Sequence, residues 1–448
     1  MNKFKNWLIA GAISLSFTAC DQLLDVKPVL SIDEQTALST EADVKVTLTG
    51  AFDGLSSGNL YGGGYWYANE LVGDGGEVRF GGTYATMDEI WRKAVTTSNG
   101  VILGIWADSY ATINRANHVL ANLDKVSAAN KDSFEGQARF VRGAVYFELV
   151  KLFGKTWGDG DNNTNPGVPI VLTPTKAVTE ADYKARNSVA AVYAQVIEDL
   201  TTAVNQLPDN TDDTFVSKYA AKALLSRVYL MQRDYAKARD AANAVIESGA
   251  FGLAGSFEEA FMDDTNGDEA IFRIVVSEQD GVNDMNTFFA STLSNGRGDV
   301  RVQTAHTSLY EPDDARLGFF ESTSKGKFTL KFADQFGDVV PFRLAEMYLT
   351  RAEANQRLGT SVGDTPLNDV NKIRNRAGLV NLGSVTLAQI LKERHLELAF
   401  EGVQLDDVKR TGGTVGTLNY NANALVLPIP QREMDTNDKL VQNPGYGG

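Results

Sequence analysis

The chain has 448 residues, of which 43% are hydrophobic and 22% are charged, so its composition is that of a globular protein and excludes wholesale disorder. Lys and Arg number 42 against 57 Asp and Glu, and the net charge of −15 argues against nucleic-acid binding and against charge-driven adhesion to anionic lipid. One Cys excludes an internal disulfide framework. The three histidines, His118, His306 and His395, are far apart in the sequence, which argues against a histidine-based metal site.

The first twenty residues have the pattern of a bacterial lipoprotein signal. Lys3 and Lys5 precede a mostly apolar stretch over 7–17, which is too short to span a bilayer. Small residues then lead into Cys20, as in a lipobox, where the signal is cut before a Cys that carries the lipid. We therefore expect a signal peptide over 1–19 and a lipid anchor at Cys20. A plain signal peptide followed by an unmodified thiol is the alternative.

Apolar residues at helical spacing predict a series of paired helices. Over 217–248, large apolar residues on a first helix face small ones on a second, with a turn at Asp234. This is the tetratricopeptide-like pattern of a pair about 34 residues long. A second pair spans 341–378, where Thr365 offers an N-cap and Pro366 the first helical position. Further helices are predicted around 106–123, 140–150 and 189–200.

The end of the chain predicts one more helix and an extended tail. Thr386 and Gln389 form a capping box at the start of an apolar stripe. Residues 427–430 contain two prolines that require extended chain, and the apolar run 270–275 indicates a strand. Together these patterns predict a mainly α fold, a tetratricopeptide-like helical scaffold that forms a single domain over 20–448. Large loop-rich insertions are expected near 53–86, 154–185 and 249–342, where ordered loops commonly carry function.

Catalytic motifs give little support for an enzyme. The G-x-S-x-G match at 54–58 lacks the preceding strand that a nucleophile elbow needs, and no phosphate-binding or dinucleotide-binding glycine loop is present. Glycoside hydrolysis by two carboxylates stays open, because such a pair is defined in space rather than in sequence. No cofactor is implied, and we expect no metal ligands and no catalytic residues.

A glycine-rich aromatic segment is the strongest binding signal. Aromatic faces stack on the C–H faces of sugar rings, while nearby charged groups bond the hydroxyls. We interpret the segment around Trp66 as a carbohydrate contact, with Phe288 and Phe289 as a second candidate pair. The alternative is that these rings pack their loop against the scaffold. The candidate ligand-binding residues are Tyr61, Tyr65, Trp66, Tyr67, Asp74, Arg79, Tyr84, Phe288 and Phe289.

An ordered set of segments resembles the SusD/RagB family of Bacteroidetes outer-membrane lipoproteins. The set spans nearly the whole mature chain, and it is the order of the segments that makes it specific. One departure is Val403-Gln404, where the family usually has a basic residue. The segments are Cys20 with Leu24–Pro28, Ile113–Asn117, Arg139–Phe147, Leu149–Gly154, Arg343–Leu349, Arg374–Leu379, Glu393-Arg394 with Glu397–Gly402, and Leu427–Pro430 with Gln442–Tyr446.

The resemblance implies a non-catalytic lipoprotein on the cell surface, on the outer leaflet of the outer membrane. It implies that the protein binds an oligosaccharide or polysaccharide and delivers it to a SusC-like TonB-dependent transporter. The negative charge favours a neutral glucan over acidic glycans. Membrane contact would be through the lipid anchor only, with no nucleic-acid partner. Three alternatives stay open: a family member that binds peptides, a helical-repeat module that binds only proteins, and an exported glycoside hydrolase.

Overall fold

The computed structural model describes residues 38–209, 216–262, 267–279 and 281–447. The predicted signal peptide over 1–19 and the lipid anchor at Cys20 lie outside these ranges. Within them, no helix combines the length and the apolar character that a membrane span requires.

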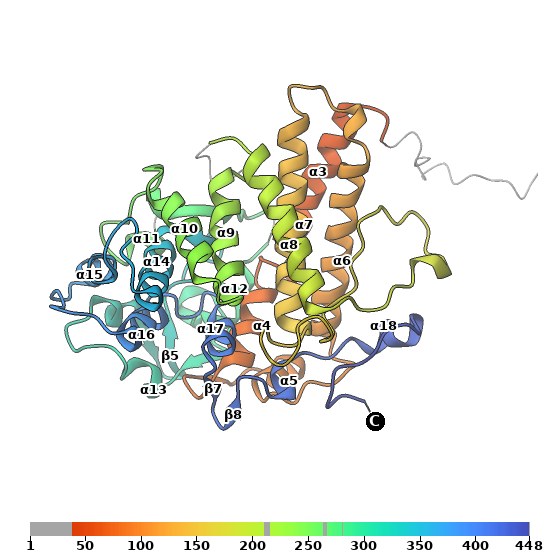
Figure 1. Cartoon of the computed structure of the whole chain (residues 1–448). Helices are drawn as coiled ribbons and strands as arrows, with labels where there is room; N and C mark the ends of the chain where they lie inside the picture. Colours follow the sequence, from red (N-terminus) through yellow and green to blue (C-terminus); the bar gives the residue numbers. More distant parts are fainter. Residues whose placement is uncertain (1–37, 210–215, 263–266, 280, 448) are drawn as a thin grey trace, which may run out of the picture.

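Helices that pack in chain order form the frame of the molecule. Four long helices, α3, α6, α7 and α8, lie side by side, and each packs on the next (Figure 1). The series continues through α9, α10 and α14 to the pair α15 and α16, as in tetratricopeptide arrays. The predicted mainly α, tetratricopeptide-like scaffold is therefore confirmed. The bounds are α3 Glu41–Ser56, α6 Gly100–Ala121, α7 Lys131–Phe153, α8 Val189–Gln206, α9 Lys218–Met231, α10 Tyr235–Ile246, α14 Leu344–Leu358, α15 Pro366–Arg376 and α16 Leu387–Glu397.

The predicted helix starts are confirmed at their caps. The Asp234 side chain accepts from the backbone of Lys237 at the start of α10, and Thr365 caps α15 in the same way. Thr386 and Gln389 form the predicted capping box of α16. These caps satisfy N–H groups that have no partner inside the helix, so each helix begins at a defined residue.

The segment 53–86 is not the loop-rich insertion that we predicted. It contains α4 (Gly64–Gly73), whose ten residues are all buried, and strand β1 (Val78–Phe80), and it reaches the start of α5 (Ala85–Trp91). A helix that is buried on every side has no amphipathic period, and the glycines before it look like a loop. Gly63 has φ 155°, and a Cβ there would lie 2.6 Å from Cβ of Asp284, so the tight entry into α4 requires glycine.

The segment 249–342 contains several short helices and strands joined by irregular chain. Strands β1, β3, β5 and β4 form a four-stranded sheet in that order, and β2 pairs with β6; all of these pairs are antiparallel. The predicted strand at 270–275 is confirmed as β2. The bounds are β2 Ala270–Ile274, β3 Val300–Val302, β4 Phe320–Thr323, β5 Gly326–Thr329 and β6 Val339–Arg343, with α11 Glu259–Met262, α12 Asp284–Phe289 and α13 Thr304–Thr307.

The C-terminal tail returns to the first half of the chain. It follows α17 (Gln404–Thr411) and the hairpin of β7 (Thr414–Val415) and β8 (Leu418–Asn419), and it includes α18 (Gln431–Thr436). The backbone N–H of Leu427 donates to Leu152 of α7 at 2.8 Å. Arg186, at the end of the irregular stretch after α7, donates to the carbonyl of Val441 and to Oδ1 of Asn443.

A buried cluster of charges joins the sheets to the helical frame. Arg343, which precedes α14 and is 2% exposed, pairs with Glu269, Glu397 and Glu401 at 3.0, 2.5 and 2.8 Å. Glu397 also pairs with Arg376 and Arg316. Burial alone raises the pKa of Glu397, but the surrounding guanidinium groups outweigh it and hold that pKa well below its usual range. The carboxylate is therefore charged and fully compensated.

We expect Glu397→Gln to lower the free energy of unfolding by about 3–5 kcal/mol, because the substitution leaves buried guanidinium groups without their partner. Urea denaturation of the purified protein measures this change. The control is Arg92→Gln, which breaks the exposed pair of Arg92 with Asp88 and should cost less than about 1 kcal/mol. Equal midpoints for the two variants would contradict the expectation.

Candidate functional site

The aromatic segment that we predicted as an exposed platform lies in the core. Tyr61, Tyr65, Trp66 and Tyr67 are all at most 4% exposed. The Tyr61 hydroxyl donates to Glu148 at 3.0 Å, and the Tyr65 hydroxyl bonds Ser109 at 2.7 Å. The prediction of a sugar-stacking face was wrong for these four rings, because α4 runs through the interior and the rings pack the scaffold.

Three further predicted residues also have structural surroundings. Phe289 is buried against Phe332. Asp74 is buried, and its Oδ1 accepts from three successive backbone N–H groups, those of residues 76–78. Arg79 is exposed on β1, opposite Arg301 of β3. The side chains of Phe289 and Asp74 are thus occupied by the protein itself, whereas Arg79 is exposed on the strand.

Two of the predicted aromatic residues do meet at the surface. Tyr84 is 48% exposed, and its ring makes an edge-to-face contact with the half-buried Phe288, with the centroids 5.7 Å apart. The Arg297 guanidinium lies 4.7 Å from the centre of the Tyr84 ring. Asp299 accepts from Arg297 Nε at 2.8 Å and so orients the guanidinium. The result is an accessible ring bordered by a fixed cation.

Asp284 extends this surface into a cavity. It lies one helical turn before Phe288 on α12, so the two side chains share a face of that helix. It lines a cavity of about 290 Å³ together with Asn283, Gly58 and Gly62. Burial raises the pKa of Asp284 to about 6. We call Asp284, Phe288, Tyr84 and Arg297 the aromatic surface site.

Sequence reasoning missed two members of this site. Arg297 stands in an Arg-Gly-Asp tripeptide with no evident link to Tyr84, and it reaches the ring only because β1 pairs with β3. Asp284 could have been found from its helical spacing to Phe288, had α12 been recognised as a helix. Tyr84 and Phe288 were found because both are aromatic residues in segments of low regularity.

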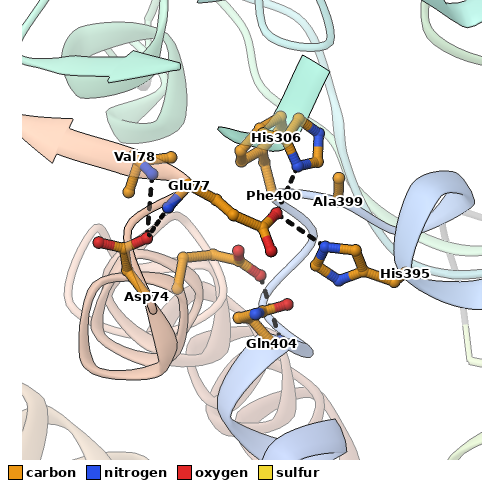
Figure 2. A pocket seen from close by; sticks show the side chains of 9 residues that line it. Asp74, Glu77, Val78, His306, His395, Ala399, Phe400 and Gln404 are labelled. Carbon is orange, nitrogen blue, oxygen red and sulfur yellow. Dashed lines mark hydrogen bonds and ion pairs between the residues drawn. The ribbon is translucent and has the colours of Figure 1, made fainter. Parts of the chain in front are cut away.

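A second cluster of chemically active side chains lies beside β1. Glu77 Oε2 is 2.5 Å from Nδ1 of His306 and 2.7 Å from Nε2 of His395 (Figure 2). Burial alone raises the pKa of Glu77, but the two imidazoles hold that pKa at about 2. Burial lowers the pKa of His306 below its ordinary value, whereas the carboxylate outweighs burial at His395 and raises its pKa. The distance between the histidines in sequence, our reason for excluding a metal site, therefore carries no weight.

Two polar side chains of α4, Glu70 and Asn69, hold the start of α17. Oε1 of Glu70 accepts from the backbone N–H groups of Gly402 and Val403 at 2.8 and 3.1 Å. Asn69 Oδ1 accepts from Leu405 at 2.8 Å. The polar residues of the buried helix α4 thus serve as the N-terminal cap of α17. Burial raises the pKa of Glu70 to about 7.

A helical-repeat frame with a small inserted sheet is also the architecture of SusD superfamily structures. A SusD superfamily protein from Bacteroides thetaiotaomicron superposes with a TM-score of 0.81 at 25% identity, covering 90% of this chain and 100% of that one. SusD-like protein P2 of Formosa agariphila is 25% identical over 521 aligned positions, covering all of both chains.

Two family models match the chain at either end. Residues 22–230 match a family described as starch-binding and associating with the outer membrane, and residues 330–425 match the SusD family. The starch-binding protein SusD of Bacteroides thetaiotaomicron is 34% identical over 169 residues, which cover 34% of this chain and 29% of that protein. The chain belongs to the SusD family.

We expect Trp66→Ala to lower the free energy of unfolding by about 3–5 kcal/mol, the cost of removing a large buried ring. Trp66 packs edge-on against Phe332, and the ring lies directly on Gly402. Chemical denaturation measures the change. A variant as stable as the wild-type protein would show that the ring is not part of the core.

Proposed function

We propose that the protein is a cell-surface glycan-binding lipoprotein that captures an oligosaccharide or polysaccharide at the aromatic surface site. It then delivers this glycan to a SusC-like TonB-dependent transporter. It sits in the outer membrane through a lipid on Cys20 and has no catalytic role.

The exposed ring of Tyr84, beside Phe288 and beneath Arg297, is the observation that carries this proposal. An accessible aromatic face matches the apolar face of a sugar ring, and the guanidinium and the Asp284 carboxyl supply directed bonds to hydroxyls. The cavity beside Asp284 gives one sugar unit room to enter. Each contact is weak, so the site depends on several of them acting together.

The relatives support the choice of ligand. The family model that matches 22–230 is described as starch-binding, and the relative that is 34% identical is named a starch-binding protein. The net charge of −15 opposes sulfated or uronic glycans, so we propose a neutral glucan. Delivery to a transporter follows from the family resemblance and from the expected lipid anchor.

The surroundings of Asp284 favour binding over hydrolysis. A glycosidase of the common type needs two carboxyl groups on either side of the scissile bond. Among the described residues that line the cavity of Asp284, no other is acidic. Ser56, the centre of the G-x-S-x-G match, donates its hydroxyl to the backbone of Asp53 at 2.9 Å. The structure therefore offers no hydrolase arrangement at these two places.

We expect Tyr84→Ala to weaken glucan binding by about 1–2 kcal/mol, the contribution of a stacking platform, without loss of stability. A glycan array on the wild-type protein identifies the ligand, and calorimetry with that ligand compares the variants. Retained affinity in Tyr84→Ala would remove the ring from the site. Cleavage of the glycan, or binding of peptides alone on a parallel array, would contradict the proposed function.

The matched control for this test is Tyr235→Ala. Tyr235, on α10, also stacks with an arginine, since Arg357 lies 4.7 Å from its ring centre, the same distance as in the pair of Tyr84 and Arg297. Its removal deletes an equivalent cation–π pair on the helical frame. We expect unchanged glycan affinity for this variant.

We expect Cys20→Ser to abolish lipid attachment and release the protein from the outer membrane. Metabolic labelling with an alkyne-modified fatty acid and fractionation of cells measure both effects. A protein that stays membrane-bound and labelled after this substitution would show that Cys20 is not the anchor.

A further inference from the structure

Three metal-binding side chains converge from distant parts of the chain. Glu77 precedes β1, His306 belongs to α13 and His395 to α16, and their ligand atoms all lie within 4.8 Å of one another. Figure 2 shows both imidazoles directed at the same carboxylate oxygen. Two imidazole nitrogens and one carboxylate form a donor set that binds divalent transition metals.

The two ring nitrogens of His306 have different partners. Nδ1 lies 2.5 Å from Oε2 of Glu77, and Nε2 lies 3.0 Å from the Tyr310 hydroxyl, which is also 3.2 Å from the carbonyl of Leu396. In the tautomer whose hydrogen is on Nε2, this nitrogen donates to the Tyr310 hydroxyl, which donates in turn to Leu396. Nδ1 then offers its lone pair to a cation in place of its hydrogen bond to Glu77.

The charges around the cluster also favour a cation. Elsewhere in the described structure, buried carboxylates pair with arginine or lysine, as Glu397 and Glu401 do with Arg343. Glu70, Asp74 and Glu77 line one pocket, and no Lys or Arg nitrogen among the described residues lies within 4.0 Å of their carboxylate oxygens. Of the described residues, only His306 and His395 pair with the Glu77 carboxylate.

The size of the pocket restricts the ligand to a single ion. Its cavity measures about 20 Å³, space for one water-sized particle. Two nitrogen ligands disfavour Ca²⁺ and Mg²⁺, which prefer oxygen alone. Tetrahedral Zn²⁺ with bonds of about 2.0–2.2 Å holds its ligand atoms more than about 3 Å apart, so the Glu77 carboxylate, which is partly exposed, moves back from both imidazoles when the ion binds. We propose that Glu77, His306 and His395 bind one Zn²⁺ ion.

This ion would fasten one end of the strands β1 and β3. Glu77 directly precedes β1, and the backbone of Gln303, just after β3, donates to the Glu77 carbonyl at 2.8 Å. The opposite end of the same pair leads to Tyr84 and Arg297. The metal would thus connect the sheet to α16, which is fixed in the frame. Metal binding itself does not depend on the proposed function, and the test below contains no glycan.

The test is a titration of tag-free, EDTA-treated protein with Co²⁺ and then with Zn²⁺. We expect one Co²⁺ per chain with a visible ligand-field spectrum, its displacement by Zn²⁺, and a higher melting temperature with either ion. Glu77→Gln and His395→Ala should abolish the spectrum. Tyr310→Phe removes the hydroxyl that bonds Nε2 of His306 and orients its ring. This substitution should weaken metal binding by about 10–100-fold and shift the spectrum.

The control variant is His118→Ala, which removes the one histidine outside the cluster and should bind as the wild-type protein does. A wild-type protein that binds no Co²⁺ and gains no stability from Zn²⁺ overturns the proposal, and this result needs no variant to fold. Equal loss in His118→Ala also overturns it. Zn²⁺ binding without any glycan binding would support this site and refute the glycan function. Glycan binding without any Zn²⁺ binding would refute this site and leave the glycan function standing.

Discussion

The buried cluster around Arg343 is the constraint on which the C-terminal half of the structure depends. Glu269 comes from the approach to β2, Glu397 from α16 and Glu401 from the turn before α17, and all three meet one guanidinium. A buried charge is tolerated only with its partners in place, so sheet, helix and turn cannot shift independently. Apolar packing alone would allow such sliding. The ion pairs therefore fix β6 and the approach to β2 against α16 and the turn before α17.

The pairing of β1 with β3 orders a second part of the molecule. Its register places Val78 opposite Val302 and Phe80 opposite Val300, with all four side chains buried. A slip by one residue would turn these side chains outward, so the register is strongly specified. Both clusters of interest lie at the ends of this short pair, where residues distant in sequence become neighbours. The strands themselves contribute mainly rigidity.

The helical frame could be predicted from the sequence, whereas the site largely could not. Helices such as α10 and α16 have one apolar face and a capping residue, and both signals are local. Helix α4 has neither, since it is buried all round and starts at glycines, so its tyrosines looked like exposed loop residues. Arg297 reaches Tyr84, and His306 reaches Glu77, only because β1 pairs with β3. No periodicity along one segment can reveal a contact that two distant segments create.

The attachment of the C-terminal tail has a consequence for how the molecule forms. Leu427 bonds the backbone of α7, and Gln431 bonds Thr97 just before α6, so residues far along the chain complete the packing of much earlier helices. Contacts between such remote positions carry a large loop-closure entropy and slow the acquisition of the native state. A chain whose C-terminal tail is not yet in place consequently exposes the surface of α6 and α7 that this tail covers. It is in this interval, rather than once fully formed, that the polypeptide has most need of chaperone protection.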